Sequence, residues 1–176
     1  MKQFYMDTNV FISKLKSDDP YHRAANSIVR ALEKREIQAE TSVLTLLETA
    51  SVLSRLYRAK KSGEEKRKVF IVKTLKRLSG LAKFVNIAGD APIPIKGMNA
   101  SLPSIFNEAI VLSLQCNLRT LDLIHLAAAR HGKRMNGELG AFVTGDGGFL
   151  SEKRGLSEVI NMPILSPNEY ASGLGI

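Results

Sequence analysis

The sequence predicts an α/β fold in which helices cover both faces of a central parallel sheet of four to five strands. Short β-prone segments alternate with helical periodicity along the 176 residues, and such alternation builds parallel βαβ units. Asp7 directly follows one predicted strand and Asp146 lies two residues after another, and binding sites of parallel sheets lie beyond the carboxyl ends of their strands. The length fits one domain over residues 1–176.

Three strands are predicted in the first half of the chain, and helices separate them. Each strand is a short β-prone run, and each helix has apolar residues three or four positions apart. The predicted strands cover residues 2–6, 37–42 and 83–87. The predicted helices begin directly after Asp7, open at 18–21 with Pro20 in the first turn, and cover 45–57 and 64–81.

The second half of the chain predicts two helices, two short strands and one long loop. Gly and Pro residues mark the loop, which we interpret as an insertion. The helices are expected over 104–115 and 119–131, the strands over 141–144 and Val159–Ile160, and the loop over 89–103.

Composition indicates a soluble cytoplasmic protein with a polyanionic partner. The formal net charge of +8 favours association with nucleic acid. No apolar run approaches the roughly 18 residues of a membrane span, and the N-terminus lacks the pattern of a signal peptide. The single cysteine, Cys116, excludes a disulfide within one chain and a cysteine-rich zinc cluster. Because it lies in a helical pattern of leucines, we expect it in the core.

Basic residues are concentrated between Arg55 and Arg77, where the pattern indicates two helices separated at Ser62-Gly63. Two interpretations remain open for this segment. It is either a solvated helical face or a surface that contacts phosphates.

Four acidic residues occur in apolar settings, although carboxylates are mostly found on solvated faces. They are Asp7, Glu48, Asp122 and Asp146. Each has an ordinary explanation by itself: a helix cap, a helix dipole, a turn, or the edge of an amphipathic helix. Glu48 shares a helical stripe with Leu47 and Val52, which predicts that it faces inward.

Taken together, the four acids indicate a divalent metal site. Two like charges about 4 Å apart repel by roughly 4 kcal/mol at an effective dielectric of 20, and a divalent cation would remove that penalty. Oxygen ligands suit Mg²⁺ or Mn²⁺, whereas the spacing of the three histidines does not predict zinc. His125 lies three residues after Asp122, and we interpret it as a packing and hydrogen-bonding residue rather than a base or ligand.

Sequence motifs of other enzyme classes are missing. No Gly-x-x-x-x-Gly-Lys-Ser/Thr phosphate loop, Gly-x-Gly-x-x-Gly dinucleotide fingerprint or Gly-x-Ser-x-Gly elbow occurs in the chain. Four short motifs do occur in order: MDTNVF at 6–11, LLET at 46–49, LDLIHLAAA at 121–129 and VTGDGGF at 143–149. Their order and spacing resemble those of PIN-domain ribonucleases, including the VapC toxins.

This resemblance implies a three-layer αβα fold and metal-dependent cleavage of single-stranded RNA. It makes Asp7, Glu48, Asp122 and Asp146 the catalytic, metal-binding acids, with Asn9 and Thr144 as polar supports. It also implies a homodimer and, if the protein is a toxin, an antitoxin protein as partner. Basic residues at the rim would hold the RNA backbone, and the candidates are Lys60, Lys61, Arg67 and Lys68.

Several functions remain open at this point. The resemblance favours an endoribonuclease that hydrolyses phosphodiester bonds, either as a toxin or as a stand-alone RNA-processing enzyme. A catalytically silent RNA-binding or regulatory module would keep the fold and the basic face without a working site. A metal-dependent phosphatase or a flap-type DNA nuclease is a third alternative.

Overall fold

A five-stranded parallel sheet forms the centre of the molecule, as predicted. The computed structural model describes residues 2–59, 63–85, 92–94 and 101–176. The strand order is β3-β2-β1-β6-β7, and every pairing in this sheet is parallel. The strands are β1 (Lys2–Met6), β2 (Ile37–Ser42), β3 (Ala82–Val85), β6 (Leu139–Val143) and β7 (Ile164–Leu165).

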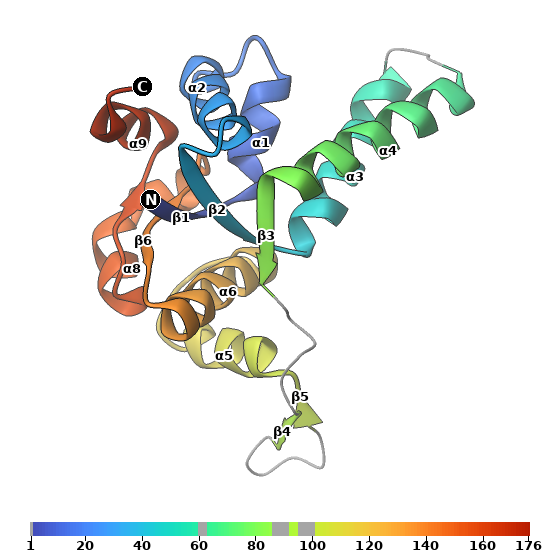
Figure 1. Cartoon of the computed structure of the whole chain (residues 1–176). Coiled ribbons are helices and arrows are strands. Elements are labelled where there is room, and N and C mark those ends of the chain that lie inside the picture. The colour runs from blue at the N-terminus through green and yellow to red at the C-terminus, as the bar shows by residue number, and fades with distance from the viewer. Residues whose placement is uncertain (1, 60–62, 86–91, 95–100) are drawn as a thin grey trace.

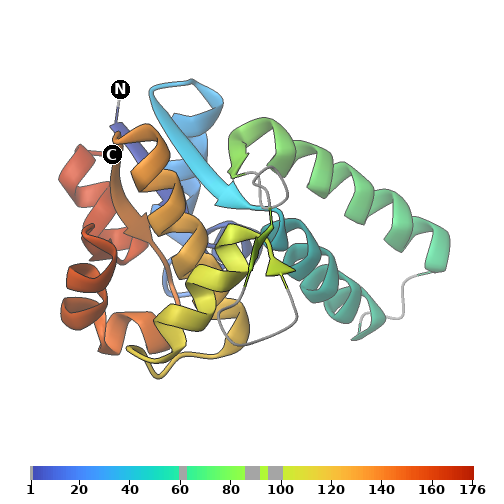
Figure 2. The same cartoon turned by 90° about the horizontal axis from the view of Figure 1, so that it is seen from below.

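Helices cover both faces of this sheet, which confirms the three-layer αβα arrangement (Figures 1 and 2). Side chains alternate between the faces of a strand: Phe4 and Met6 join one hydrophobic core, and Tyr5 joins the other. The first core contains residues of α1 (Thr8–Leu15), α2 (His22–Glu33) and α9 (Pro167–Leu174). The second contains residues of α5 (Ser104–Ser113), α6 (Thr120–Asn136), α7 (Gly147–Ser151) and α8 (Lys153–Ile160).

Two further helices form an arm that projects away from the sheet (Figure 1). They are α3 (Leu44–Ala59) and α4 (Glu64–Leu81), and they correspond to the predicted helices over 45–57 and 64–81. The rings of Tyr57 and Phe70 pack 4.7 Å apart between them. The buried residues of α4, Thr74 and Leu78, lie in its second half, so its first half depends on contacts within the arm.

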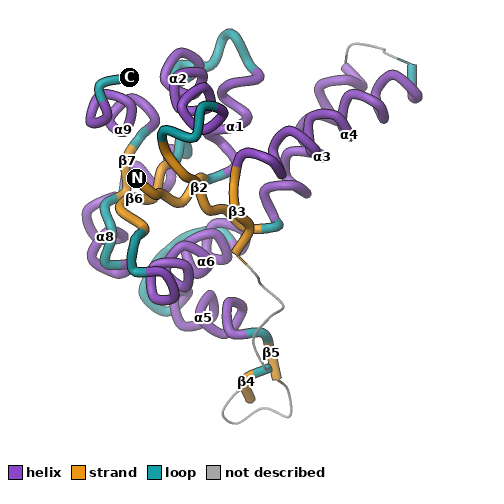
Figure 3. Tube along the Cα trace, viewed as in Figure 1, coloured by secondary structure: helices purple, strands orange, loops and turns teal. Residues whose placement is uncertain are grey.

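The stretch 89–103 is not entirely a loop. Ile93–Pro94 (β4) pairs antiparallel with Ser101–Leu102 (β5), and these strands form a small sheet beside α5 (Figure 3). The remaining positions of that stretch before 101, other than 92–94, lie outside the described residues. The Pro and Gly residues predicted a loop here. The two strands were missed because two residues are too few to show the alternation that indicates a strand.

The predicted strand at Val159–Ile160 is wrong. Both residues end α8, where Leu156 and Ile160, four positions apart, bury one helical face. Asn161 closes the helix in the left-handed conformation, with φ at 51°. The last strand is β7, in which Ile164 pairs with Phe142 of β6. The β-branched pair suggested a strand, but helical packing decided its conformation.

Two smaller expectations need correction. The predicted inward stripe of α3 is largely open, because Leu47 is 65% exposed and the buried positions are Thr45, Thr49 and Leu53. Cys116 is buried, as predicted, but it follows the end of α5 rather than lying within a helix. None of the helices in the described ranges combines the length and the apolar character that crossing a membrane requires.

Candidate active site

The predicted site residues come from four elements that meet at the carboxyl edge of the sheet. Asp7 follows β1, and Thr144 and Asp146 follow the adjacent β6. Met6 pairs with Val143, and the Asp7 amide donates a 3.0 Å hydrogen bond to the Val143 carbonyl. These two strands therefore end side by side, and α3 and α6 bring Glu48 and Asp122 to the same edge.

Asp7 is held rigidly at the start of α1. Its side chain is the helix N-cap: Oδ1 accepts a 2.7 Å bond from the Thr8 amide. Oδ2 accepts bonds from Asn9 Nδ2 at 3.1 Å and from the Thr144 hydroxyl at 2.6 Å. Burial raises the pKa of Asp7, although the charge of His125 and these hydrogen bonds oppose the rise. The two predicted supports, Asn9 and Thr144, thus contact the same carboxylate oxygen.

Glu48 faces Asp7 across the site from α3. Its Oε2 accepts hydrogen bonds from the Thr8 hydroxyl and, at 2.9 Å, from His125 Nε2. Burial alone would raise the pKa of Glu48, but the bonds from His125 and Thr8 outweigh burial and lower it. Glu48 is therefore ionised at neutral pH. The sequence did not indicate a role for Thr8, whose position one residue after Asp7 is its only signal.

His125 is buried beneath the acids and makes the hydrogen bonds that were predicted for it. Its Nδ1 lies 2.9 Å from the Tyr5 hydroxyl, and its Nε2 lies 4.0 Å from Asp7 Oδ1. Burial lowers the pKa of His125, but the hydrogen bond to Glu48 and the charges of Asp7 and Glu48 outweigh burial and raise it. An ionised carboxylate only accepts hydrogen bonds. His125 Nε2 therefore carries a hydrogen, and this N–H donates the hydrogen bond to Glu48.

Asp122 and Asp146 are less buried than Asp7. Asp122, in the first turn of α6, is half-buried, and its pKa is raised by burial and then by the charges of Asp146 and Asp7. Asp146 caps α7 through a 2.7 Å bond from the Gly148 amide to Oδ1. The Asp146 amide donates a 3.0 Å bond to the Thr144 hydroxyl, which in turn holds Asp7.

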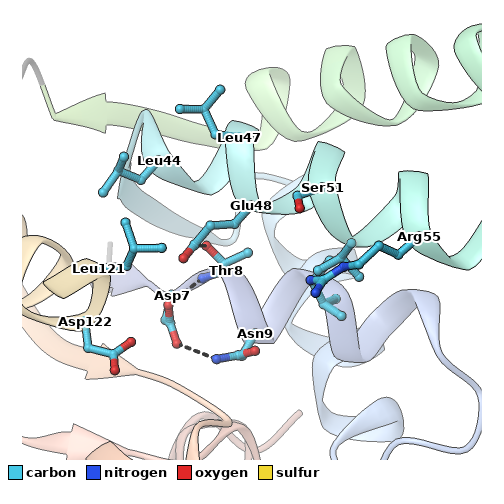
Figure 4. A pocket seen from close by; sticks show the side chains of 12 residues that line it. Asp7, Thr8, Asn9, Leu44, Leu47, Glu48, Ser51, Arg55, Leu121 and Asp122 are labelled. Carbon is cyan, nitrogen blue, oxygen red and sulfur yellow. Dashed lines mark hydrogen bonds between the residues drawn. The ribbon is translucent and has the colours of Figure 1, made fainter. Parts of the chain in front are cut away.

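A cavity of about 390 Å³ opens over these residues. Its acidic floor consists of Asp7, Glu48 and Asp122, and its walls are mainly apolar (Figure 4). Asp146 is not among the described residues that line it. The other lining residues are Thr8, Asn9, Ile12, Leu44, Leu47, Ser51, Val52, Arg55 and Leu121.

A comparison with protein families finds a match to the PIN domain over residues 3–103. This chain belongs to the PIN-domain family. The match includes Asp7 and Glu48 and ends before α6, so Asp122 and His125 lie beyond it. No curated protein matches the chain. PIN domains are in general nucleases that bind divalent metals.

The side chains of this PIN domain fit a divalent cation. Asp7, Glu48 and His125 each offer one ligand atom, and these atoms lie within 4.8 Å of one another. Because the N–H at His125 Nε2 donates a hydrogen bond to Glu48, this nitrogen is not available to a cation. The carboxylate oxygens are the atoms that could bind it, and His125 orients Glu48. Burial, followed by the charges of neighbouring acids, raises the pKa of Asp122, and burial raises that of Asp7; a bound cation would favour the ionised form of both carboxyls.

The basic residues predicted to bind RNA do not line the cavity where the structure describes them. Lys60 and Lys61 lie outside the described residues. Arg67 and Lys68 lie near the start of α4, on the outer part of the arm, and Lys68 pairs with Glu64 at 2.9 Å. Instead, Arg55 of α3 lines the cavity. Its position seven residues after Glu48, two helical turns along the same face, was the available signal.

Proposed function

We propose that this PIN domain is an endoribonuclease that hydrolyses phosphodiester bonds of single-stranded RNA with Mg²⁺ or Mn²⁺. The observation that carries the proposal is the meeting of Asp7, Glu48 and Asp122 in one open cavity at the carboxyl edge of the sheet. Oxygen ligands without cysteine favour Mg²⁺ or Mn²⁺ over softer metals. The family membership supports nuclease activity, and the net charge of +8 supports a polyanionic substrate.

The carboxylates of Asp7, Glu48 and Asp122 would hold the cation, with Asp146 beside Asp122. When bound, a divalent cation polarises a phosphate and lowers the pKa of water for in-line attack. The surrounding residues keep the acids in place: Asn9 and Thr144 fix Asp7, while Thr8 and His125 fix Glu48. Fixed groups need no rearrangement as the transition state forms. Asp122 is less buried than Asp7 and therefore more accessible to phosphate and water.

Substitution of the acids tests this function. Asp122→Asn and Asp7→Asn should each abolish metal-dependent cleavage of a single-stranded RNA, because each removes a negative ligand of the cation. Asp18→Asn, at an exposed acid before α2, is the matched control and should cleave like the wild type. Circular dichroism and melting curves establish that all three variants fold. Cleavage that persists in excess chelator, or in either site variant, would reject the proposal.

The nature of the substrate needs a separate comparison. Single-stranded RNA, single-stranded DNA and a small phosphate ester should be offered to the same preparation with Mg²⁺ and with Mn²⁺. We expect cleavage of the RNA above both other substrates. Preferred cleavage of DNA or of the ester would favour the alternative nuclease or phosphatase function, and salt-sensitive RNA binding without Mn²⁺ binding would favour a silent RNA-binding module.

We also propose that the protein forms a homodimer, and the exposed apolar side chains of the arm support this. Val69 and Val72 of α4 are 45% and 53% exposed, and burying such residues between two copies is favourable. Light scattering should show a dimer that Val72→Glu weakens, and a monomeric wild type would contradict this. A toxin role with an antitoxin partner stays a prediction, which growth arrest upon expression would test.

A further inference from the structure

Arg55 is the arginine among the described residues that line the cavity, and acids do not occupy its side chain as they occupy those of some other arginines. Arg77 pairs with Glu33, and Arg130 and Arg134 pair with Glu108. Within the described part of the chain, Arg55 has no ion pair or hydrogen bond of its side chain, although it lines the cavity that holds three acids. Its guanidinium group is exposed and therefore accessible to a ligand in that cavity.

The cavity extends along α3 from the acids to Arg55. Seven residues separate Glu48 from Arg55, which corresponds to about 10 Å along a helix with a 1.5 Å rise per residue. Ser51 and Val52 lie between them on the same lining surface, and Ile12 of α1 adds to the apolar wall. Figure 4 shows Glu48 at one end of this row and Arg55 at the other. The cavity is thus acidic at one end and basic at the other.

A nucleic acid strand in this cavity would place one phosphate at the acidic end and a neighbouring phosphate at the basic end. The acids, with their cation, would receive the phosphate that is cleaved, but they offer no attraction to the neighbouring phosphates. A guanidinium group binds a phosphate through two parallel charge-assisted hydrogen bonds. The apolar wall between the two ends suits the sugar and base of one nucleotide better than a third charged group.

We propose that Arg55 binds a phosphate adjacent to the scissile phosphate and so sets the position of the RNA strand along α3. This inference rests on the proposed function and adds to it a path for the strand, from Asp122 past Glu48 and along α3 to Arg55. Arg55 reads the backbone rather than a base edge, so its contribution is independent of sequence. It acts mainly on substrate binding, because the acids and their cation carry out the chemistry.

The test compares Arg55→Ala, Arg55→Lys and Arg58→Ala. Arg58 is the matched control, since it is an exposed arginine of the same helix that does not line the cavity. Cleavage of a short single-stranded RNA by Arg55→Ala should show a KM raised about tenfold, the loss expected for a charge-assisted hydrogen bond, with kcat little changed. Arg55→Lys should recover part of this loss, and Arg58→Ala should match the wild type.

Two further readouts separate a phosphate contact from a structural role. The salt dependence of RNA binding should weaken in Arg55→Ala by about 0.7 in slope, the value for one phosphate of a single strand. Mn²⁺ affinity, measured by calorimetry, should be unchanged in all three variants because Arg55 does not contact the carboxylates.

The outcomes distinguish this inference from the proposed function. If the wild type cleaves RNA but Arg55→Ala keeps the KM and the salt slope of Arg58→Ala, the role of Arg55 is overturned and the nuclease function stands. A lower kcat with unchanged KM also overturns it. If the wild type does not cleave RNA, the nuclease function fails, and the salt slopes of RNA binding alone decide whether Arg55 contacts a phosphate.

Discussion

Buried carboxylates occur in two places around the central sheet, and the fold compensates them differently. Glu40, within β2, is 1% exposed; its Oε1 accepts a 2.9 Å bond from Gln3 Nε2 and lies 3.7 Å from Lys83 Nζ. Asp7, which directly follows the adjacent strand β1, is 2% exposed and lies near other acids, Glu48 and Asp122. Glu40 has an amide and a cation beside it, whereas Asp7 has donors and competing negative charge.

This difference concerns how each group of acids is compensated. A buried carboxylate needs compensation for lost hydration. Gln3 and Lys83 supply it to Glu40 from within the fold. In the cavity, the charge of His125 lowers the pKa of Asp7, but burial and the neighbouring acids raise the pKa of both Asp7 and Asp122. Acids that gather beside an open cavity therefore indicate a cation that comes from solution.

Among the groups that compensate the buried acids, the largest expected effect is that of His125, the hydrogen-bond partner of Glu48. His125→Leu removes the proton donor to Glu48 and should lower cleavage activity or metal affinity by about 10- to 100-fold, as loss of a ligand-orienting group does. His125→Gln keeps an amide donor and should retain more of both. Cleavage rates and Mn²⁺ calorimetry measure the effect. Equal losses in two folded variants would show that the donor does not matter.

Glu40 should matter for stability instead. Glu40→Ala leaves a cavity beneath α6 and takes away the acceptor of the Gln3 amide, so we expect the free energy of unfolding to fall by about 2 kcal/mol. Urea denaturation measures this change. Glu36→Ala, at an exposed acid near Lys34, is the control and should change little. If Glu40→Ala also abolished Mn²⁺ binding in the folded protein, the distinction between Glu40 as a structural acid and the acids of the cavity as metal ligands would be contradicted.

Asp122→Asn should stabilise the metal-free fold, whereas Glu40→Ala should destabilise it. Its pKa is raised in the folded protein, chiefly by burial, so ionisation at neutral pH destabilises the fold. Asp122→Asn should therefore raise the metal-free melting temperature by about 2 °C at pH 7, a value kept small because the group is partly solvated. The gain should disappear below about pH 4, where the carboxyl is protonated in the folded and unfolded states. A lower melting temperature at pH 7 would indicate a structural acid.

The smallest effect is expected for an exposed acid that has its own cation. Lys153, followed by the Ser166 cap, lowers the pKa of Glu169 to about 2. A lowered pKa stabilises the fold above the unfolded value of about 4.3, and this contribution is lost as pH falls toward 2. Glu169→Gln should thus cost less than about 1 kcal/mol at pH 7 and nothing near pH 2. Melting curves over this range measure it, and a pH-independent difference would contradict the assignment.

Much of the fold could be predicted because its signals are local. Strands over 2–6 and 37–42 and the helix over 64–81 have the predicted bounds, since hydrophobic periodicity reports directly which elements form. Val159–Ile160 was mistaken for a strand because β-branched residues also fit a buried helical face. The open stripe of α3 was mistaken for a buried one because an apolar stripe can line a cavity as well as a core.

The site was predictable only in part, since its residues are distant in the sequence. Asp7, Glu48 and Asp122 stood out by motif spacing, and they line one cavity. Neither Thr8, which donates to Glu48, nor Arg55, at the far end of the cavity, carried a signal strong enough to select it. Glu40 shows the converse problem, because nothing local reveals that a strand acid will be buried beside Gln3 and Lys83.

The sequence by itself determined the alternation of strands and helices, the charge of the protein and the acids that end up at one edge of the sheet, because these depend on residue type and spacing. The tertiary structure alone decided which acids are compensated from within. Glu40 acquires Gln3 and Lys83 from the neighbouring strands, while Asp7 and Asp122 lie close enough for like charges to interact. Electrostatic energies depend on distances between side chains and on their exposure to water, and both are set only when the chain folds.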